Sequence, residues 1–200
     1  MIFIAVFIGV LYQFPIQVRL FNATPLWPTA IDREIPFMDW TIWLYCSYYV
    51  FLFLPFWLCR DQLRAARALY GLMANSILGG LIFLVWPTSG ALQHPDMEGL
   101  SGLLWNALLS ADRPTNYFPS LHVANACICA LALGREKNAW RYFAPLWTLL
   151  IVISTVTTKQ HFFIDLPAGM VLAAFCYWLV RKGVRIEARP RRHRAVASAR

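Results

Sequence analysis

Residues 113–122 of the chain read RPTNYFPSLH, and residues 154–165 read STVTTKQHFFID. Both stretches are polar and adjoin long apolar runs, and each contains one of the four histidines, His122 in the first and His161 in the second. The apolar sequence between them is long enough for one helix out and one helix back. We therefore expect the two stretches to meet at one end of a helical scaffold that the remaining chain provides.

The composition around these stretches is that of a membrane protein. Of the 200 residues, 59% are hydrophobic and only 14% are charged, whereas a soluble domain carries about 25% charged residues. The net charge of +8 raises the question of nucleic acid. Most basic residues, however, lie in short segments between apolar runs or in the C-terminal tail, as they do in membrane proteins. We therefore expect no nucleic-acid partner.

The apolar runs predict an all-α, polytopic membrane protein with six transmembrane helices. The second of these spans is rich in Tyr and Trp, which is typical of an interfacial belt, and residues 99–110 have the apolar spacing of a helix that lies in the interface. We expect one membrane domain, residues 1–183, and a basic, disordered tail, residues 184–200. The predicted spans are residues 1–16, 40–58, 69–86, 119–133, 142–158 and 162–180.

Lys and Arg residues are unequally distributed between the two sides of this topology. Fourteen lie in the segments after the second and fourth spans and in the tail, and four lie on the opposite side. Because Lys and Arg collect in cytoplasmic segments, both termini are predicted to be cytoplasmic. Both polar stretches then face the outside of a plasma or inner membrane. The fourteen are Arg60, Arg64, Arg67, Arg135, Lys137, Arg141, Arg181, Lys182, Arg185, Arg189, Arg191, Arg192, Arg194 and Arg200; the four are Arg19, Arg33, Arg113 and Lys159.

His161 and Asp165 are four residues apart, which places both on one face at the start of a helix. A carboxylate there can accept a hydrogen bond from one imidazole nitrogen and leave the other nitrogen free to attack an electrophile. The same spacing also suits a His–Asp pair that only satisfies its own hydrogen bonds at the membrane edge. Taken alone, the pair leaves a structural and a nucleophilic role open.

The first stretch offers a binding place for an anion. Pro119 suits the first turn of a helix, where its missing N–H costs nothing, and the free N–H groups of such a turn attract anions. Ser120 adds a hydroxyl, Asn116 can help to cap the helix, and His122 follows as a candidate acid.

Arg113 and Lys159 are the two basic residues next to the polar stretches, and each can neutralise phosphate oxygens or extend to lipid headgroups. An anion site, two cations, a histidine with an orienting carboxylate and a second histidine together fit phosphoryl transfer. One histidine attacks phosphorus, and the other protonates the leaving oxygen. This chemistry requires no metal or other cofactor, and we expect none.

Two other interpretations compete with this one. His122, His161 and Asp165 have the chemistry of a zinc site with an open position, although the nearby cations would repel a metal ion. A non-catalytic membrane carrier would line a pathway with polar residues deep in its spans, and Asn75 and Ser76 in the third span are its best candidates.

The motifs resemble those of the type 2 phosphatidic acid phosphatase superfamily. The run Pro119-Ser120-Leu121-His122 is similar to the family signature Pro-Ser-Gly-His. Ser154, His161 and Asp165 reproduce the spacing of a second signature, Ser-Arg-x5-His-x3-Asp.

The resemblance implies a role for each matching residue. His161 would be the nucleophile that forms a phosphohistidine, Asp165 would orient it, and His122 would protonate the leaving group. Ser120 would help to bind phosphate, and the other residues assigned to phosphate binding are Arg113, Asn116, Ser154 and Lys159.

The chain departs from the family mainly at its cations. Of the first family signature, Lys-x6-Arg-Pro, only Arg113-Pro114 is present, and Asn106 stands where Lys is expected. Thr155 replaces the Arg that follows the signature Ser. Lys159 is predicted to supply this missing charge.

Residues 116–122, NYFPSLH, and residues 158–162, TKQHF, resemble the inositol phosphorylceramide synthase (aureobasidin-resistance) branch of the superfamily. Members of that branch pass a phospho-headgroup from a phospholipid to a lipid alcohol. A phosphatase and a transferase of this type share the phosphohistidine and differ in the acceptor, water or a lipid hydroxyl, and both remain open. The implied partners are membrane lipids: a lipid phosphate or phospholipid substrate and, for a transferase, a lipid alcohol.

Overall fold

The computed structural model describes residues 9–10, 14, 18, 20–90, 92, 97–111 and 115–183. The predicted first span lies almost entirely outside these residues, and the basic tail and Arg113 lie wholly outside them. Within them the chain is mostly helical, so the predicted all-α class is confirmed at that level.

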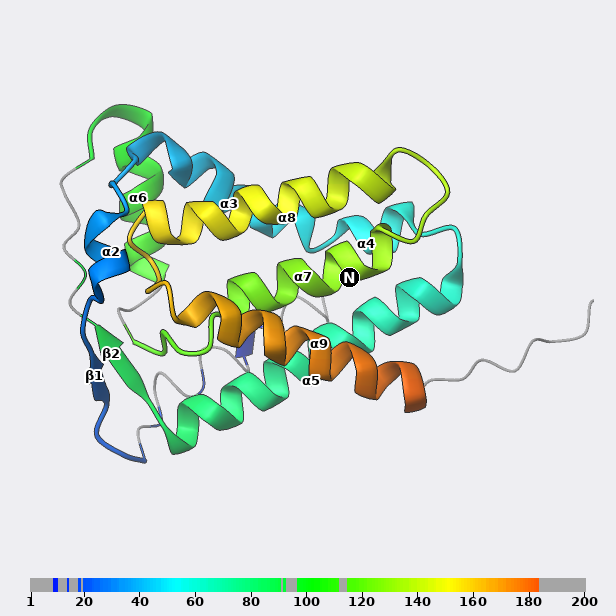
Figure 1. Ribbon diagram of the computed structural model, residues 1–200, viewed down its shortest axis with the longest axis horizontal. Coiled ribbons are helices and arrows are strands. Elements are labelled where there is room, and N and C mark those ends of the chain that lie inside the picture. Colours follow the sequence, from blue (N-terminus) through cyan, green and yellow to red (C-terminus); the bar gives the residue numbers. More distant parts are fainter. Residues whose placement is uncertain are drawn as a thin grey trace, which may run out of the picture.

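Helix α7 (Leu121–Leu133) is the centre of the bundle. It packs against α5 (Gln62–Val85), α8 (Trp140–Thr157) and α9 (Asp165–Gly183), while α3 (Ile42–Phe51) lies against both α7 and α8 (Figure 1). Most residues of α7 are apolar and buried, which is typical of a helix enclosed by its neighbours.

Glycines allow the neighbouring helices to approach α7 closely. A Cβ at Gly79 of α5 would overlap the side chain of Leu121, and a Cβ at Gly169 of α9 would lie 2.5 Å from the backbone oxygen of Ser120. Small residues at helix contacts are the usual means of close packing in membrane bundles. The second contact brings the start of α9 against the start of α7.

The predicted second span, residues 40–58, is broken rather than continuous. A short 3-10 helix, η1 (Asp39–Thr41), leads into α3, and a two-residue turn separates α3 from α4 (Leu54–Leu58). Pro55 lies in the first turn of α4, where a residue without an N–H is tolerated. It therefore begins a new helix instead of kinking the old one.

Two helix starts also differ from the prediction. Helix α5 begins at Gln62 rather than at residue 69, because the Asp61 side chain accepts a hydrogen bond from the N–H of Leu63 at 2.9 Å and caps the helix. Helix α7 begins at Leu121 with Ser120 as its N-cap, so Pro119 lies before the helix and not in its first turn.

Short elements gather at the end of the bundle where α5 ends and α7 begins (Figure 1). Strand β1 (Thr24–Leu26) pairs in parallel with β2 (Thr88–Gly90), and α2 (Ala30–Glu34) and α6 (Gly99–Ala111) lie at the same end. The helix predicted over residues 99–110 is confirmed by α6. The strand pair was not predicted, because strands of three residues in a Pro-rich segment are too short to show alternation.

Helix α5 has 24 residues, and an 18-residue window within it has a mean hydropathy of 1.9. Among the described residues it is the one helix that is both long and apolar enough to cross a membrane. The 13 residues of α7 extend about 20 Å, which is less than the roughly 30 Å of a bilayer core. On these criteria the described residues support one of the six predicted spans.

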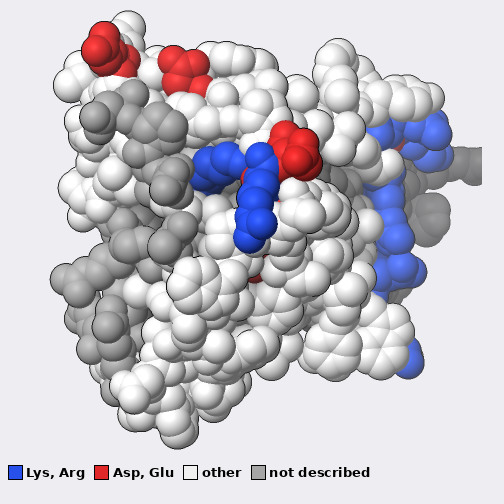
Figure 2. All heavy atoms as spheres, turned by 60° about the vertical axis from the view of Figure 1, so that its left-hand side comes forward, with Lys and Arg blue, Asp and Glu red and all other residues white. Residues whose placement is uncertain are grey.

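The surface nevertheless has a large apolar share. Most of the face shown in Figure 2 is uncharged, and Lys and Arg occur in two groups, one on the front of the view and one at its right edge. Large apolar side chains point outward from α8 and α9, including Leu146, 53% exposed, and Val171, 69% exposed. Such exposure is typical of a surface that contacts lipid.

Candidate active site

His161 lies in the turn that joins α8 to α9, not in a helix. Lys159 adopts a positive φ of 57° after the end of α8, and the backbone N–H groups of Gln160 and His161 both donate to the carbonyl of Thr155 at 3.0 Å. Asp165 is the first residue of α9. The four-residue spacing therefore does bring His161 and Asp165 together, but through a turn rather than along a helix.

The carboxylate of Asp165 orients the ring of His161. Nδ1 of His161 is 3.2 Å from Oδ2 of Asp165, and the backbone N–H of Phe162 donates to the same oxygen at 2.9 Å. Asp165 is completely buried, and His161 is 8% exposed. With Nδ1–H donating to the carboxylate, Nε2 carries the lone pair of the ring.

His122 lies in the first turn of α7, beside two tyrosines of α3. The hydroxyl of Tyr45 is 2.9 Å from Nε2 of His122, and the centroid of the Tyr48 ring is 4.6 Å from that of His122. The histidine is 7% exposed. Helix α3 therefore fixes the position of the His122 ring.

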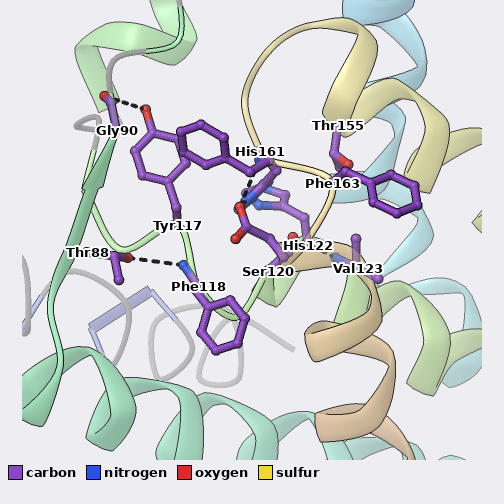
Figure 3. A network of polar contacts seen from close by, with 12 residues as sticks. Thr88, Gly90, Tyr117, Phe118, Ser120, His122, Val123, Thr155, His161 and Phe163 are labelled. Carbon is purple, nitrogen blue, oxygen red and sulfur yellow. Dashed lines mark hydrogen bonds and ion pairs between the residues drawn. The ribbon is translucent and has the colours of Figure 1, made fainter. Parts of the chain in front are cut away.

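The structure brings the two histidines together. Their ring centroids are 5.8 Å apart, and the two rings lie next to each other at the centre of Figure 3. The starts of α7 and α9 are joined by a hydrogen bond from the backbone N–H of Ser120 to the carbonyl of Asp165, at 3.3 Å. This bond and the close contact at Gly169 hold one histidine against the other.

A buried polar chain lies behind His122. Nδ2 of Asn75 in α5 donates to Oδ1 of Asn125 in α7 at 2.6 Å, and Nδ2 of Asn125 donates to the hydroxyl of Tyr48 at 2.9 Å. Ser76, next to Asn75, donates to the carbonyl of Leu72 in its own helix. Asn75 and Ser76, the two residues that a non-catalytic carrier would use to line a pathway, therefore form hydrogen bonds within the bundle.

The candidate phosphate ligands have different surroundings. Ser120 caps α7, and its Oγ accepts the N–H of Val123 at 3.3 Å. Ser154 is buried in α8, and its hydroxyl donates to the carbonyl of Ile151 at 2.6 Å. Asn116 has a φ of 61° and is 4% exposed, and within the described residues its Nδ2 has no hydrogen-bond partner.

Lys159 is bonded to the segment around α2. Its ammonium donates to the backbone carbonyls of Asp32 at 2.8 Å and Ile35 at 2.5 Å. Burial lowers the pKa of Lys159, and the nearby charge of Asp32 acts in the opposite direction. These two bonds use two of the three N–H donors of the ammonium, and the predicted role of Lys159 as a phosphate ligand stays a prediction.

Asp32 connects α2 to the turn that carries His161, and sequence reasoning missed it. Its Oδ1 accepts the N–H of Phe163 at 2.6 Å, and its Oδ2 accepts the N–H and the hydroxyl of Thr29 at 2.8 and 2.6 Å. Asp32 is 5% exposed. The signal was present as a capping box, Thr29-x-x-Asp32.

Tyr45 and Tyr48 were also missed as site residues, because the Tyr-rich second span was interpreted as an interfacial belt. Their spacing carried a second signal: Ile42, Tyr45, Tyr48 and Phe51 recur every third residue, and all are buried. Such a period marks the inward face of a helix. Trp40 and Trp43 are more than half exposed, as a belt requires.

The arrangement brings together a histidine whose ring faces a carboxylate and a second histidine ring 5.8 Å away, which are the kinds of groups that nucleophilic and acid–base catalysis use. Within the described ranges, no group of three or more His, Cys, Asp or Glu side chains is placed to hold a metal ion.

A comparison with known protein families identifies a match. The model of the PAP2 superfamily matches residues 17–179, a range that includes both histidines and most of the bundle. The chain belongs to the PAP2 superfamily. No curated protein and no solved structure matches it.

Family membership supports an enzyme of the phosphatase or phosphotransferase type that acts on lipid phosphates and is associated with a membrane. The superfamily predicted from the motifs is thereby confirmed. Its inositol phosphorylceramide synthase-like branch stays a prediction.

Proposed function

We propose that the chain is a metal-independent lipid phosphate phosphatase or phosphotransferase that works through a phosphohistidine on His161. One observation carries the proposal: Nδ1 of His161 faces the buried carboxylate of Asp165, and the His161 ring lies 5.8 Å from the ring of His122. In-line phosphoryl transfer needs an oriented nucleophile and an acid that reaches the leaving oxygen.

The reaction has two steps. In the first, Nε2 of His161 attacks phosphorus, an N–P bond forms, the P–O bond to the lipid breaks, and His122 gives a proton to the leaving oxygen. Asp165 stabilises the positive charge that the His161 ring acquires. In the second, His122 takes the proton of the acceptor hydroxyl, its oxygen attacks phosphorus, and the N–P bond breaks.

The phosphoryl oxygens are bound at the start of α7. The N–H groups of this first turn, apart from that of Val123, which Ser120 caps, form an anion site with the hydroxyl hydrogen of Ser120. The buried amide of Asn116 supplies a donor that has no partner in the described part of the chain. Arg113 and Ser154 are further candidates. Lys159 is another candidate, through the third N–H of its ammonium, since its two carbonyl bonds use only two donors.

The site works at the outer face of a plasma or inner membrane, in a protein with six spans and cytoplasmic termini. The support is the distribution of Lys and Arg, fourteen against four, together with the apolar side chains exposed on α8 and α9. Lipids of the outer leaflet are then the substrates.

The acceptor is water in a phosphatase and a lipid alcohol in a transferase. The match to the PAP2 superfamily is compatible with either acceptor. The alternative, a headgroup transferase of the inositol phosphorylceramide synthase type, is favoured by the resemblance of residues 116–122 and 158–162 to that branch.

Purified protein incubated with headgroup-labelled phospholipid tests both outcomes. The reaction is run alone, with ceramide, with diacylglycerol, and in each case with and without a chelator. Release of free phosphate or phospho-headgroup identifies water as the acceptor, and a new labelled lipid identifies a lipid alcohol. Activity that disappears with the chelator would contradict the metal-independent mechanism, and no activity with any lipid would contradict the enzyme.

A further inference from the structure

A groove lies toward the other end of the bundle from the two histidines. Its volume is about 550 Å3, and α7, α8 and α9 line it, with Leu131, Pro145 and Met170 among its apolar walls. The groove ends at Arg135, which is about 20 Å from His122 when the distance is counted along the axis of α7. Cavities of this size hold small ligands, and the distance makes the groove separate from the candidate active site.

Two arginines lie at one end of this groove, Arg135 in the turn after α7 and Arg141 in the first turn of α8. The guanidinium of Arg135 lies over the ring of Tyr177 at 5.7 Å, and that of Arg141 over the ring of Tyr142 at 4.9 Å. An aromatic face positions a guanidinium without neutralising its charge.

The acidic side chains at this end are bonded to a different arginine. Glu136 pairs with Arg64 at 3.0 Å, and Asp61 pairs with Arg64 at 3.4 Å. In the described part of the chain, no acidic side chain forms an ion pair with Arg135 or Arg141. Both charges are therefore available to an anion at the mouth of an apolar groove.

The whole end of the bundle is basic. Within the described residues it has eight Lys or Arg side chains and two acidic ones, and basic residues gather at the right edge of Figure 2. The predicted orientation places this end at the cytoplasmic leaflet, where anionic lipids are found. The basic residues are Arg60, Arg64, Arg67, Arg135, Lys137, Arg141, Arg181 and Lys182, and the acidic ones are Asp61 and Glu136.

We propose that this groove binds an anionic phospholipid of the cytoplasmic leaflet. The phosphate lies between Arg135 and Arg141, whose planar donors suit phosphate oxygens, and one acyl chain lies along Leu131, Pro145 and Met170. The bound lipid bridges α7, α8 and α9, so it stabilises the bundle and is not a substrate. This inference goes beyond the proposed reaction and does not rest on it, since it concerns binding at a separate place.

The test measures lipid binding to the full chain, purified in a zwitterionic detergent, by native mass spectrometry. Phosphatidylglycerol and phosphatidylcholine with identical acyl chains are added. The unmodified chain is expected to bind phosphatidylglycerol more tightly, and the double variant Arg135→Gln/Arg141→Gln is expected to lose about tenfold or more in that affinity. The double variant Arg181→Gln/Lys182→Gln removes the same charge at the same end but outside the groove, and it should bind like the unmodified chain.

A second variant tests the groove itself. Ala174 is exposed and lines the groove, so Ala174→Phe fills it without changing any charge, and the affinity for phosphatidylglycerol should fall. Equal affinity for the two lipids, equal losses in the two charge variants, or unchanged binding in Ala174→Phe each overturns the proposal. Unfolding temperatures in detergent without added lipid verify that the variants are folded, and turnover is not used as a readout.

Discussion

Nε2 of His161 is the atom on which the proposed reaction depends. Asp165 engages the other ring nitrogen at 3.2 Å, so removal of the ring removes the nucleophile and leaves a buried carboxylate behind. We expect His161→Ala to lower turnover to background and to form no phosphoenzyme when incubated with lipid labelled on phosphorus. Trapping in denaturant at high pH, where phosphohistidine survives, measures this. A phosphoenzyme that persists in the variant would place the nucleophile elsewhere.

His122 has a different role, and the leaving group reveals it. An alkoxide needs a proton to leave, whereas 4-nitrophenolate does not, and general acids contribute about 100- to 10,000-fold. We expect His122→Gln to lower kcat/KM for an alkyl phosphate by a factor in this range and to affect 4-nitrophenyl phosphate much less. The ratio of the two kcat/KM values is the measurement, with His161→Ala, which should lose both activities, as the control. Equal losses for both substrates would show that His122 is not the acid.

Helix α2 is a short element that contacts the turn carrying His161 through Asp32. The Asp32 carboxylate accepts the N–H of Phe163 at 2.6 Å, two residues beyond His161, and Lys159 bonds back to the carbonyl of Asp32. We expect Asp32→Ala to release this turn and to lower kcat by up to about 100-fold, the cost of a nucleophile displaced by about 1 Å. The unfolding temperature should fall as well.

Three comparisons separate positioning from general instability. Asp32→Asn retains an acceptor and should recover part of the kcat, and Glu34→Ala removes an exposed carboxylate of the same helix and should change neither quantity. Lys159→Met is expected to lower kcat and the unfolding temperature, as Asp32→Ala does. The inhibition constant of orthovanadate, an anion that resembles phosphate, should change little. A large rise in that constant would instead make Lys159 a phosphate ligand and restore the role that its sequence position suggests.

The contact between α7 and α9 makes a prediction about packing. A Cβ at Gly169 would lie 2.5 Å from the backbone oxygen of Ser120, so Gly169→Ala forces the two helices apart. Overpacking of this kind costs about 1–3 kcal/mol, and the unfolding temperature in detergent should fall. Gly183→Ala, at the end of the same helix with nothing within 4 Å, is the matched control. Equal effects of the two changes would contradict the close contact.

Elements of helical length were predictable from the sequence, and the contacts between them were not. The apolar spacing of residues 99–110 leads to α6 and the apolar run at residues 142–158 leads to α8, because both patterns are local properties of the sequence. The pairing of β1 with β2 and the hydrogen bond from the N–H of Phe163 to Asp32 join residues far apart in the chain. A single sequence holds no direct signal for such contacts. The motif spacing placed His161 near Asp165, but the turn that holds them follows from backbone bonds to Thr155.

Over the whole molecule, the unequal distribution of Lys and Arg predicts one orientation in the membrane. The histidines lie at the end with α2 and α6, and the basic residues of the described chain, apart from Arg33 and Lys159, lie at the other end. Positive charge is retained on the cytoplasmic side. In sealed right-side-out vesicles, we therefore expect the protein to hydrolyse a membrane-impermeant phosphate ester supplied outside. A C-terminal epitope should at the same time be protected from external protease.

Inside-out vesicles are the control for this orientation and should give the reverse of both results. Detergent should expose the epitope and the site together in either preparation, which verifies that the vesicles were sealed. Hydrolysis and epitope cleavage on the same side would contradict the predicted topology. The site follows the third of the six predicted spans, so three spans separate it from the C-terminus, and an odd number of spans places the two on opposite faces. Full inversion, with hydrolysis only in inside-out vesicles and epitope cleavage only in right-side-out ones, would relocate the lipid groove, since Arg135 and Arg141 would then face the outer leaflet.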